Sequence, residues 1–155
     1  IAYWKELLDD FSGANSINVD CLDKKKQENQ IVEWNIPEPL FGSVKRLISE
    51  FSISVNTLVE YVWGRVLQSY QGSDDAVFGK VISGRETVNE ADNIVGLYIN
   101  TIPVRVKSMN GNTIREALQS LQLQGMQNIY MHKKMVFIST FKLMFQFNYH
   151  LKMRI

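Results

Sequence analysis

Two β-rich runs separated by a polar segment constrain the fold of this chain most. The first run, 76–82, reads AVFGKVI, and the tripeptide Ser-Gly-Arg at 83–85 ends it. The second run, 95–106, reads VGLYINTIPVRV, and the polar, acidic residues 86–93 before it are typical of a surface loop. Because Pro103 cannot donate a backbone hydrogen bond, the second strand is either broken there or lies at a sheet edge.

Amphipathic helices are predicted on both sides of these strands. Apolar residues recur at helical spacing in four segments: 3–11, 40–51, 58–70 and 114–130. Ser54 is placed to cap the third helix, and Thr113 and Glu116 have the spacing of a capping box at the start of the fourth. Trp63 and Tyr70 are interpreted as core residues of the third helix rather than as a ligand platform.

Two further segments complete the outline. The apolar run 31–36 is predicted to be a strand that Pro37 and Pro39 terminate. The acidic pair Asp74 and Asp75 is interpreted as part of a turn, because no basic partner is near in the sequence. Helices and strands are mixed and no repeat is visible, so the predicted fold class is α/β.

Composition excludes several classes of protein. The chain has 155 residues, 45% of them hydrophobic, and a net charge of +1, which indicates a globular protein with no electrostatic footprint for nucleic acid or an anionic membrane. No apolar stretch has the length of a membrane span, and the first residues do not form a signal peptide. Cys21 is the only cysteine, so an internal disulfide is excluded and a cytoplasmic location is expected.

Chemistry-bearing residues are few. His132 and His150 lack metal-ligand partners at helical spacing, and they are interpreted as incidental, so no metal site is predicted. The chain contains no GxSxG, Walker A or GxGxxG motif and no complete catalytic constellation.

The candidate site lies where the two β-rich runs end or turn polar. It consists of Ser83, Gly84 and Arg85 after the first run and of Asn100 and Thr101 within the second. If these polar groups are buried, they must be hydrogen-bonded. Two interpretations stay open: they satisfy backbone groups at the sheet edges, or they line a channel for a polar, amide-bearing substrate.

These residues resemble a known family. VFGKVISGR at 77–85, followed by VGLYINTIPVRV at 95–106, is similar to the VVFGxVVSGR and VGLFINTLPVRV signatures of the condensation domains of non-ribosomal peptide synthetases. YWKELL at 3–8 and the helix that begins NTLVEYVWG at 56–64 resemble further segments of that family in the same order.

The resemblance implies a fold and a reaction. Such domains consist of two halves related to chloramphenicol acetyltransferase, and the implied architecture here is the C-terminal half, a two-layer sandwich with a mixed sheet and helices on one face. A tunnel between the halves receives two substrates, each held by the 4'-phosphopantetheine of a carrier domain, so no cofactor is expected to bind directly. The implied partners are the N-terminal half and the peptidyl carrier and adenylation domains of a synthetase that makes a peptide antibiotic or similar secondary metabolite.

The family's HHxxxDG motif is absent, because no His-His pair occurs in the chain. That motif belongs to the first half, so the chain corresponds to the second half, no catalytic residue is assigned, and the chain alone is expected to be inactive. The INTxPVRV form resembles peptide-bond-forming members rather than epimerising ones. An inactive gene remnant and a carrier-binding module without chemistry of its own remain alternatives.

The end of the chain departs from the family pattern. Residues 131–155 contain no acidic residue and no proline where the family has a segment similar to HQDYPFE. We therefore expect a condensation-domain half at 1–130 and an aberrant tail at 131–155, in which a frameshift or a gene-model error replaces the true end after about His132; a divergent but genuine ending is the alternative. A family-like continuation in another reading frame of the gene would support the frameshift.

Overall fold

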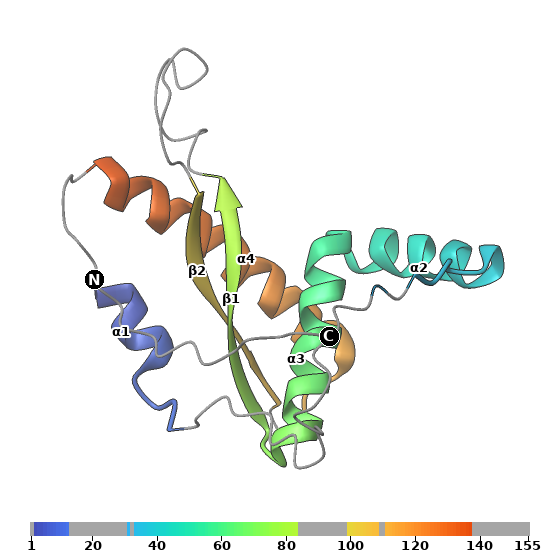
Figure 1. Cartoon of the computed structure of the whole chain (residues 1–155), viewed down its shortest axis with the longest axis horizontal. Helices are drawn as coiled ribbons and strands as arrows, with labels where there is room; N and C mark the ends of the chain where they lie inside the picture. The colour runs from blue at the N-terminus through green and yellow to red at the C-terminus, as the bar shows by residue number, and fades with distance from the viewer. Residues whose placement is uncertain (1, 13–30, 32, 84–98, 109–110, 138–155) are drawn as a thin grey trace.

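The computed structural model describes residues 2–12, 31, 33–83, 99–108 and 111–137. Within these ranges, helices lie around one pair of antiparallel strands (Figure 1). The elements are α1 (Ala2–Leu8), α2 (Glu38–Phe51), α3 (Val55–Gln71), β1 (Asp75–Ser83), β2 (Ile99–Lys107) and α4 (Ile114–Phe137). The predicted α/β class is confirmed, whereas the mixed sheet and the acetyltransferase-like sandwich stay predictions.

Strand β2 runs without a break through Pro103, which lies opposite Gly79 of β1. The backbone of Pro103 and Arg105 faces away from β1, toward α4, so the missing N–H of the proline falls on the outer edge of the pair. There Asn128 Nδ2 donates to the carbonyl oxygen of Pro103 at 2.8 Å. Of the two predicted alternatives for this proline, the edge position is therefore correct.

Helix α4 covers that outer edge of β2 with two amide side chains one helical turn apart. Gln124 Oε1 accepts from the backbone N–H of Arg105 at 3.0 Å, and Gln124 Nε2 donates to the carbonyl oxygen of Arg105, also at 3.0 Å. Together with Asn128, these bonds satisfy backbone groups that an open strand edge would leave free. The edge is thus closed to pairing with another strand along this stretch.

The core lies on the face of the strand pair that packs against α3 and α4. Val104 and Val106 of β2 form a buried cluster with Leu121 of α4. Helix α3 approaches closely because Gly64 has no side chain: a Cβ there would lie 2.4 Å from Cγ2 of Val106. Lys80 of β1 adds an ion pair on this face, with its Nζ 2.7 Å from Oε1 of Glu60 on α3.

Both predicted helix caps are confirmed. Ser54 Oγ accepts from the backbone N–H of Thr57 at 3.0 Å at the start of α3. At the start of α4, the backbone N–H of Thr113 donates to Oε2 of Glu116 at 2.8 Å, and the backbone N–H of Glu116 donates to Thr113 Oγ1 at 3.3 Å. Helix α4 continues to Phe137, beyond the end predicted near Tyr130.

The strand predicted at 31–36 is wrong. Its described residues form no regular structure, and the side chains of Ile31 and Trp34 are 88% and 71% exposed. Pro37 and Pro39 do not end a strand but begin a helix, since Pro37 is the residue before α2 and Pro39 lies in its first turn. Proline is favoured there because the first turn of a helix leaves its N–H groups unbonded in any case.

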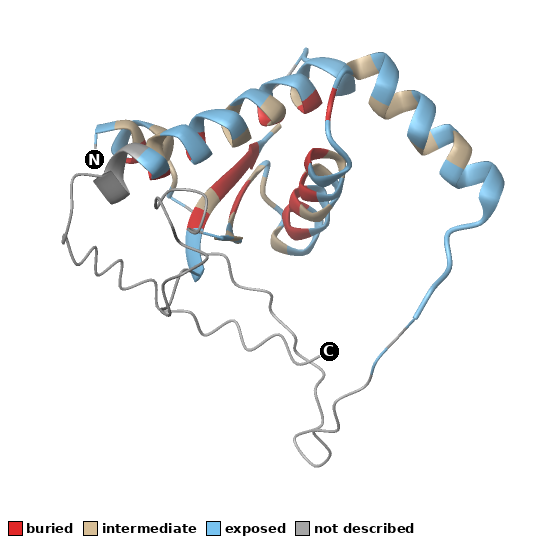
Figure 2. Ribbon diagram, turned by 90° about the horizontal axis from the view of Figure 1, so that it is seen from above, coloured by how far each residue is buried: buried red, intermediate tan, exposed pale blue. Residues whose placement is uncertain are grey.

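The apolar pattern of α3 is only partly a core pattern. Leu67 is buried and Trp63 half-buried, but Tyr70 is 69% exposed, so its assignment to the core is wrong. A second set of apolar side chains, all exposed, recurs every three or four residues along one face of the helix, and we name it the outer stripe of α3: Val55, Val59, Val62, Val66 and Tyr70. Figure 2 shows buried and exposed positions side by side along the ribbon of the helices. An exposed apolar stripe of this length is typical of a surface that contacts further polypeptide.

In the part of the chain that the structure describes, no helix is both long enough and apolar enough to cross a membrane.

Candidate functional site

The end of the strand pair where β1 ends and β2 begins brings the predicted site residues together. Ser83 lies opposite Ile99, and Asn100 lies opposite Ile82, one step further along the register. Thr101 follows Asn100, so three of the five predicted residues occupy one end of the strand pair. The other two, Gly84 and Arg85, lie outside the described residues.

Asn100 and Thr101 do not share a surface. Side chains alternate along a strand, so Asn100 lies on the face of Val104 and Val106, whereas Thr101 lies on the opposite face. Both are exposed, so they are not a buried polar pair within the strand. The backbone N–H of Thr101 donates to Oδ1 of Asn100 at 2.8 Å, which gives the asparagine a local partner.

His132 of α4 lies beside Asn100. Its Nε2 is 2.8 Å from Asn100 Nδ2, and its side chain is buried, with 7% exposed. Burial lowers the pKa of the His132 imidazole below its usual value. Spacing in the sequence gives no sign of this contact, because the partner of the histidine lies 32 residues away.

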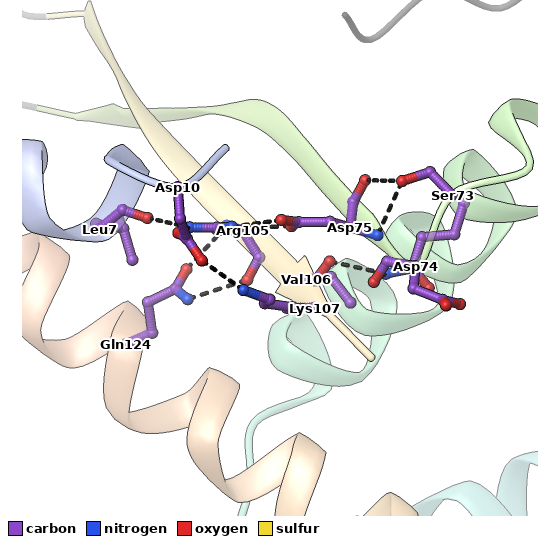
Figure 3. Close-up of polar contacts among 10 residues, drawn as sticks. Leu7, Asp10, Ser73, Asp74, Asp75, Arg105, Val106, Lys107 and Gln124 are labelled. Carbon is purple, nitrogen blue, oxygen red and sulfur yellow. Dashed lines mark hydrogen bonds and ion pairs between the residues drawn. The ribbon is translucent and has the colours of Figure 1, made fainter. Parts of the chain in front are cut away.

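A second polar cluster occupies the other end of β2 (Figure 3). Arg105 is 7% exposed, and its Nε donates to both carboxylate oxygens of Asp75 at 2.9 and 3.2 Å. Its Nη1 donates to the carbonyl oxygen of Leu7 at 2.8 Å and to the carboxylate of Asp10. Asp75 is the first residue of β1 and pairs with Lys107, so its assignment to a turn is wrong. Its charge partner, Arg105, comes from the neighbouring strand and not from nearby in the sequence.

This cluster ties the segment after α1 to the strand pair. Lys107 Nζ lies 2.6 Å from Oδ2 of Asp10, so Asp10 bridges two basic residues of β2. Hydrogen bonds from Arg105, and then from Lys107, hold the pKa of the Asp10 carboxyl well below its usual range. The hydrogen bond to Asp75 raises the pKa of Arg105 against the opposing effect of burial. The buried guanidinium is engaged by these protein acceptors, which indicates a structural role.

A groove between α1, β2 and α4 lies beside this cluster. Its lining includes Tyr3, Asp10, Arg105, Gln124 and Gln127. Among the described residues, Ser83, Asn100, Thr101 and His132 do not border it. The groove and the candidate site at the hairpin end are thus separate features of the described structure.

Comparison with known proteins identifies the family. The family model for the condensation domain matches residues 1–139. The chain belongs to the condensation domain family. The family predicted from the two strand signatures, the condensation domain of non-ribosomal peptide synthetases, is confirmed.

Curated relatives of this condensation domain are much longer proteins. Bacitracin synthase 3 of Bacillus licheniformis is 33% identical over 136 residues, which are 84% of this chain and 2% of that protein. Tyrocidine synthase 2 of Brevibacillus parabrevis is 29% identical over 81% of this chain and 4% of that protein. Surfactin synthase subunit 3 of Bacillus subtilis (strain 168) is 31% identical over 83% of this chain and 10% of that protein. The chain thus spans no more than a tenth of the length of these relatives.

Proposed function

We propose that the chain is the C-terminal half of a condensation domain and forms one wall of a tunnel in which an amide bond is made. The family match over 1–139 carries this proposal. The outer stripe of α3 supports it, because that surface is suited to packing against polypeptide outside the described residues. The lack of any His-His pair in the sequence also supports it, since the other wall then supplies the catalytic motif.

The reaction is acyl transfer from a thioester to an amine. The amine nitrogen of the acceptor aminoacyl thioester attacks the carbonyl carbon of the upstream acyl or peptidyl thioester. A C–N bond forms, the C–S bond breaks, the upstream 4'-phosphopantetheine leaves as a thiol, and the amine loses one proton. Holding the two carbonyl-bearing arms in near-attack geometry contributes as much as about 7–11 kcal/mol in favourable cases.

In this proposal, the partners of the chain are the N-terminal half of the domain and the carrier and adenylation domains of one synthetase. The carrier domains deliver both substrates on 4'-phosphopantetheine arms, and the chain itself binds no cofactor. The hairpin end with Ser83, Asn100 and Thr101 is its contribution to the tunnel wall, together with Gly84 and Arg85. The side chain of Asn100 has a defined orientation, because its Oδ1 accepts from the backbone N–H of Thr101. The proposed location is the cytoplasm.

Asn100→Ala tests the assignment of the wall. In the two-half domain that carries these residues, we expect the turnover number for amide formation between two carrier-bound substrates to fall at least tenfold, because one preorganised donor is lost where the thioester oxygen gains charge. Single-turnover kinetics with product detection by mass spectrometry measure this step directly.

Asn112→Ala is the matched control. Asn112 is an exposed asparagine just before the start of α4. It follows the end of β2, whereas Asn100 lies near the beginning of that strand. We expect the control to leave turnover within about twofold of the unsubstituted domain, because exposed substitutions away from special features have small effects. Equal turnover for the two variants would remove Asn100 from the tunnel wall.

A further inference from the structure

His132 is the one buried histidine among the described residues, and the proposed chemistry gives it no role. It projects from α4 beside β2, and its Nε2 meets the carboxamide of Asn100 at 2.8 Å. Asn100 itself is exposed near the start of β2, opposite the last residues of β1. A buried ring therefore supports an exposed polar group at the end of β2 where we place the tunnel wall.

The hydrogen bonds determine which atoms face each other. A backbone N–H can only donate, so the atom of Asn100 that receives the N–H of Thr101 must be the oxygen Oδ1. The amide nitrogen Nδ2 then faces the imidazole, and because an NH₂ group only donates, Nε2 of His132 must accept. An accepting Nε2 requires a neutral ring that carries its proton on Nδ1.

This arrangement leaves one N–H of Asn100 for another acceptor. Oδ1 and the first N–H of Nδ2 are bonded to Thr101 and His132, and the second N–H has no partner within the described residues. A carboxamide held at both ends loses little rotational freedom when a ligand binds, so its remaining N–H is a preorganised donor. Its natural acceptor is a carbonyl oxygen.

We propose that His132 is a positioning residue for Asn100: its neutral Nε2 holds the carboxamide so that the second N–H donates to the carbonyl oxygen of a thioester substrate. This inference rests on the proposed function for the identity of the acceptor, but the pairing of the two side chains does not. Without the imidazole acceptor, the amide turns freely about its terminal torsion, and the donor is aimed correctly for only part of the time.

Two substitutions separate positioning from packing. His132→Phe keeps a ring of similar shape but has no acceptor, whereas His132→Gln offers a carbonyl oxygen in place of Nε2. In the two-half domain, we expect His132→Phe to lower the turnover number about five- to tenfold with little change in KM, since one net hydrogen bond is lost. His132→Gln is expected to restore turnover to within about twofold. Equal loss in both variants would overturn the proposal, because packing alone would then explain it.

A double-substitution cycle isolates the dependence on Asn100. In the Asn100→Ala background, His132→Phe is expected to cause no further loss of turnover, because there is no amide left to orient. An undiminished five- to tenfold loss in that background would show that His132 acts by another route and would contradict the proposal.

Nitrogen NMR tests the pairing without any activity. The chain has two histidines, so ¹⁵N-histidine labelling gives two ring patterns, and a His150→Gln variant assigns them. We expect His132 to show a neutral ring protonated on Nδ1 at pH 7. A ring protonated on Nε2, or a charged ring, would overturn the inference even if the domain forms amides. The expected ring pattern in a domain that forms no amide would instead remove the proposed function and leave the pairing in place.

Discussion

Arg105→Met is expected to lower the free energy of unfolding by about 3 kcal/mol. The substitution keeps a long side chain but removes the cation that holds Asp75 of β1, so it leaves a mostly buried carboxylate without its partner. Removing one member of a buried ion pair costs about 3–5 kcal/mol, and the partial exposure of Asp75 places the expected loss at the lower end. Pulse proteolysis across a urea series measures the change.

Lys107→Met is the matched control for that experiment. It removes a cation from the same strand and from the same partner, Asp10, but both side chains are exposed to water. We expect a change within about 0.5 kcal/mol, because exposed ion pairs contribute little. If Arg105→Met were as mild as Lys107→Met, the cluster would not be what fastens the segment after α1 to the strands.

Gly64→Ala is expected to destabilise the fold by about 1–2 kcal/mol, although alanine is the better helix former. The new Cβ would lie 2.4 and 2.6 Å from two side-chain atoms of Val106. Val106 is β-branched and held in a strand, so the helix or the strand must shift. Overpacking of this kind costs about 1–3 kcal/mol, which outweighs a gain in helix propensity of about 1 kcal/mol. Urea titration followed by circular dichroism measures the net change.

Two further variants test whether the contact with Val106 causes the loss of stability expected for Gly64→Ala. Gly42→Ala in α2 places a Cβ where no atom lies within 4 Å, so we expect it to stabilise the chain by about 0.5–1 kcal/mol. Gly64→Ala combined with Val106→Ala is expected to lose less stability than the two single losses added together, because the smaller residue makes room. Stabilisation by Gly64→Ala alone would mean that α3 and β2 are further apart than described.

Local patterns in the sequence were sufficient for much of the fold. The caps at Ser54 and Thr113 depend on residues three positions apart, and both form as predicted. The prediction of a strand at 31–36 was wrong because no strand among the described elements lies beside this segment. High β propensity does not form a strand without a neighbouring strand to pair with. The assignment of Tyr70 to the core was wrong for a related reason. An apolar stripe on a helix indicates that the stripe is buried, but it does not indicate which part of the protein covers it.

The candidate site, like the fold, could be predicted from the sequence only in part. The two strand signatures singled out Ser83 and Asn100, but the sequence did not predict how the two runs pair. The antiparallel register of the structure is what brings the two residues to one end of the strand pair. His132 and the partner of Arg105 could not be found from spacing, because their contacts span 32 and 30 residues of sequence. The alternation of Val104, Arg105 and Val106 did carry a signal, since it places an arginine on the face opposite the core.

Amide formation by separated and joined halves tests the central claim most directly. The chain is incubated with two aminoacyl carrier proteins, first alone and then joined to the N-terminal half of its domain, and the carrier-bound dipeptide is detected by mass spectrometry. The account predicts no dipeptide above the uncatalysed background for the chain alone and catalysed dipeptide formation for the joined halves. Catalysed formation of dipeptide by the chain alone would contradict it, as would a joined, folded domain that produces none.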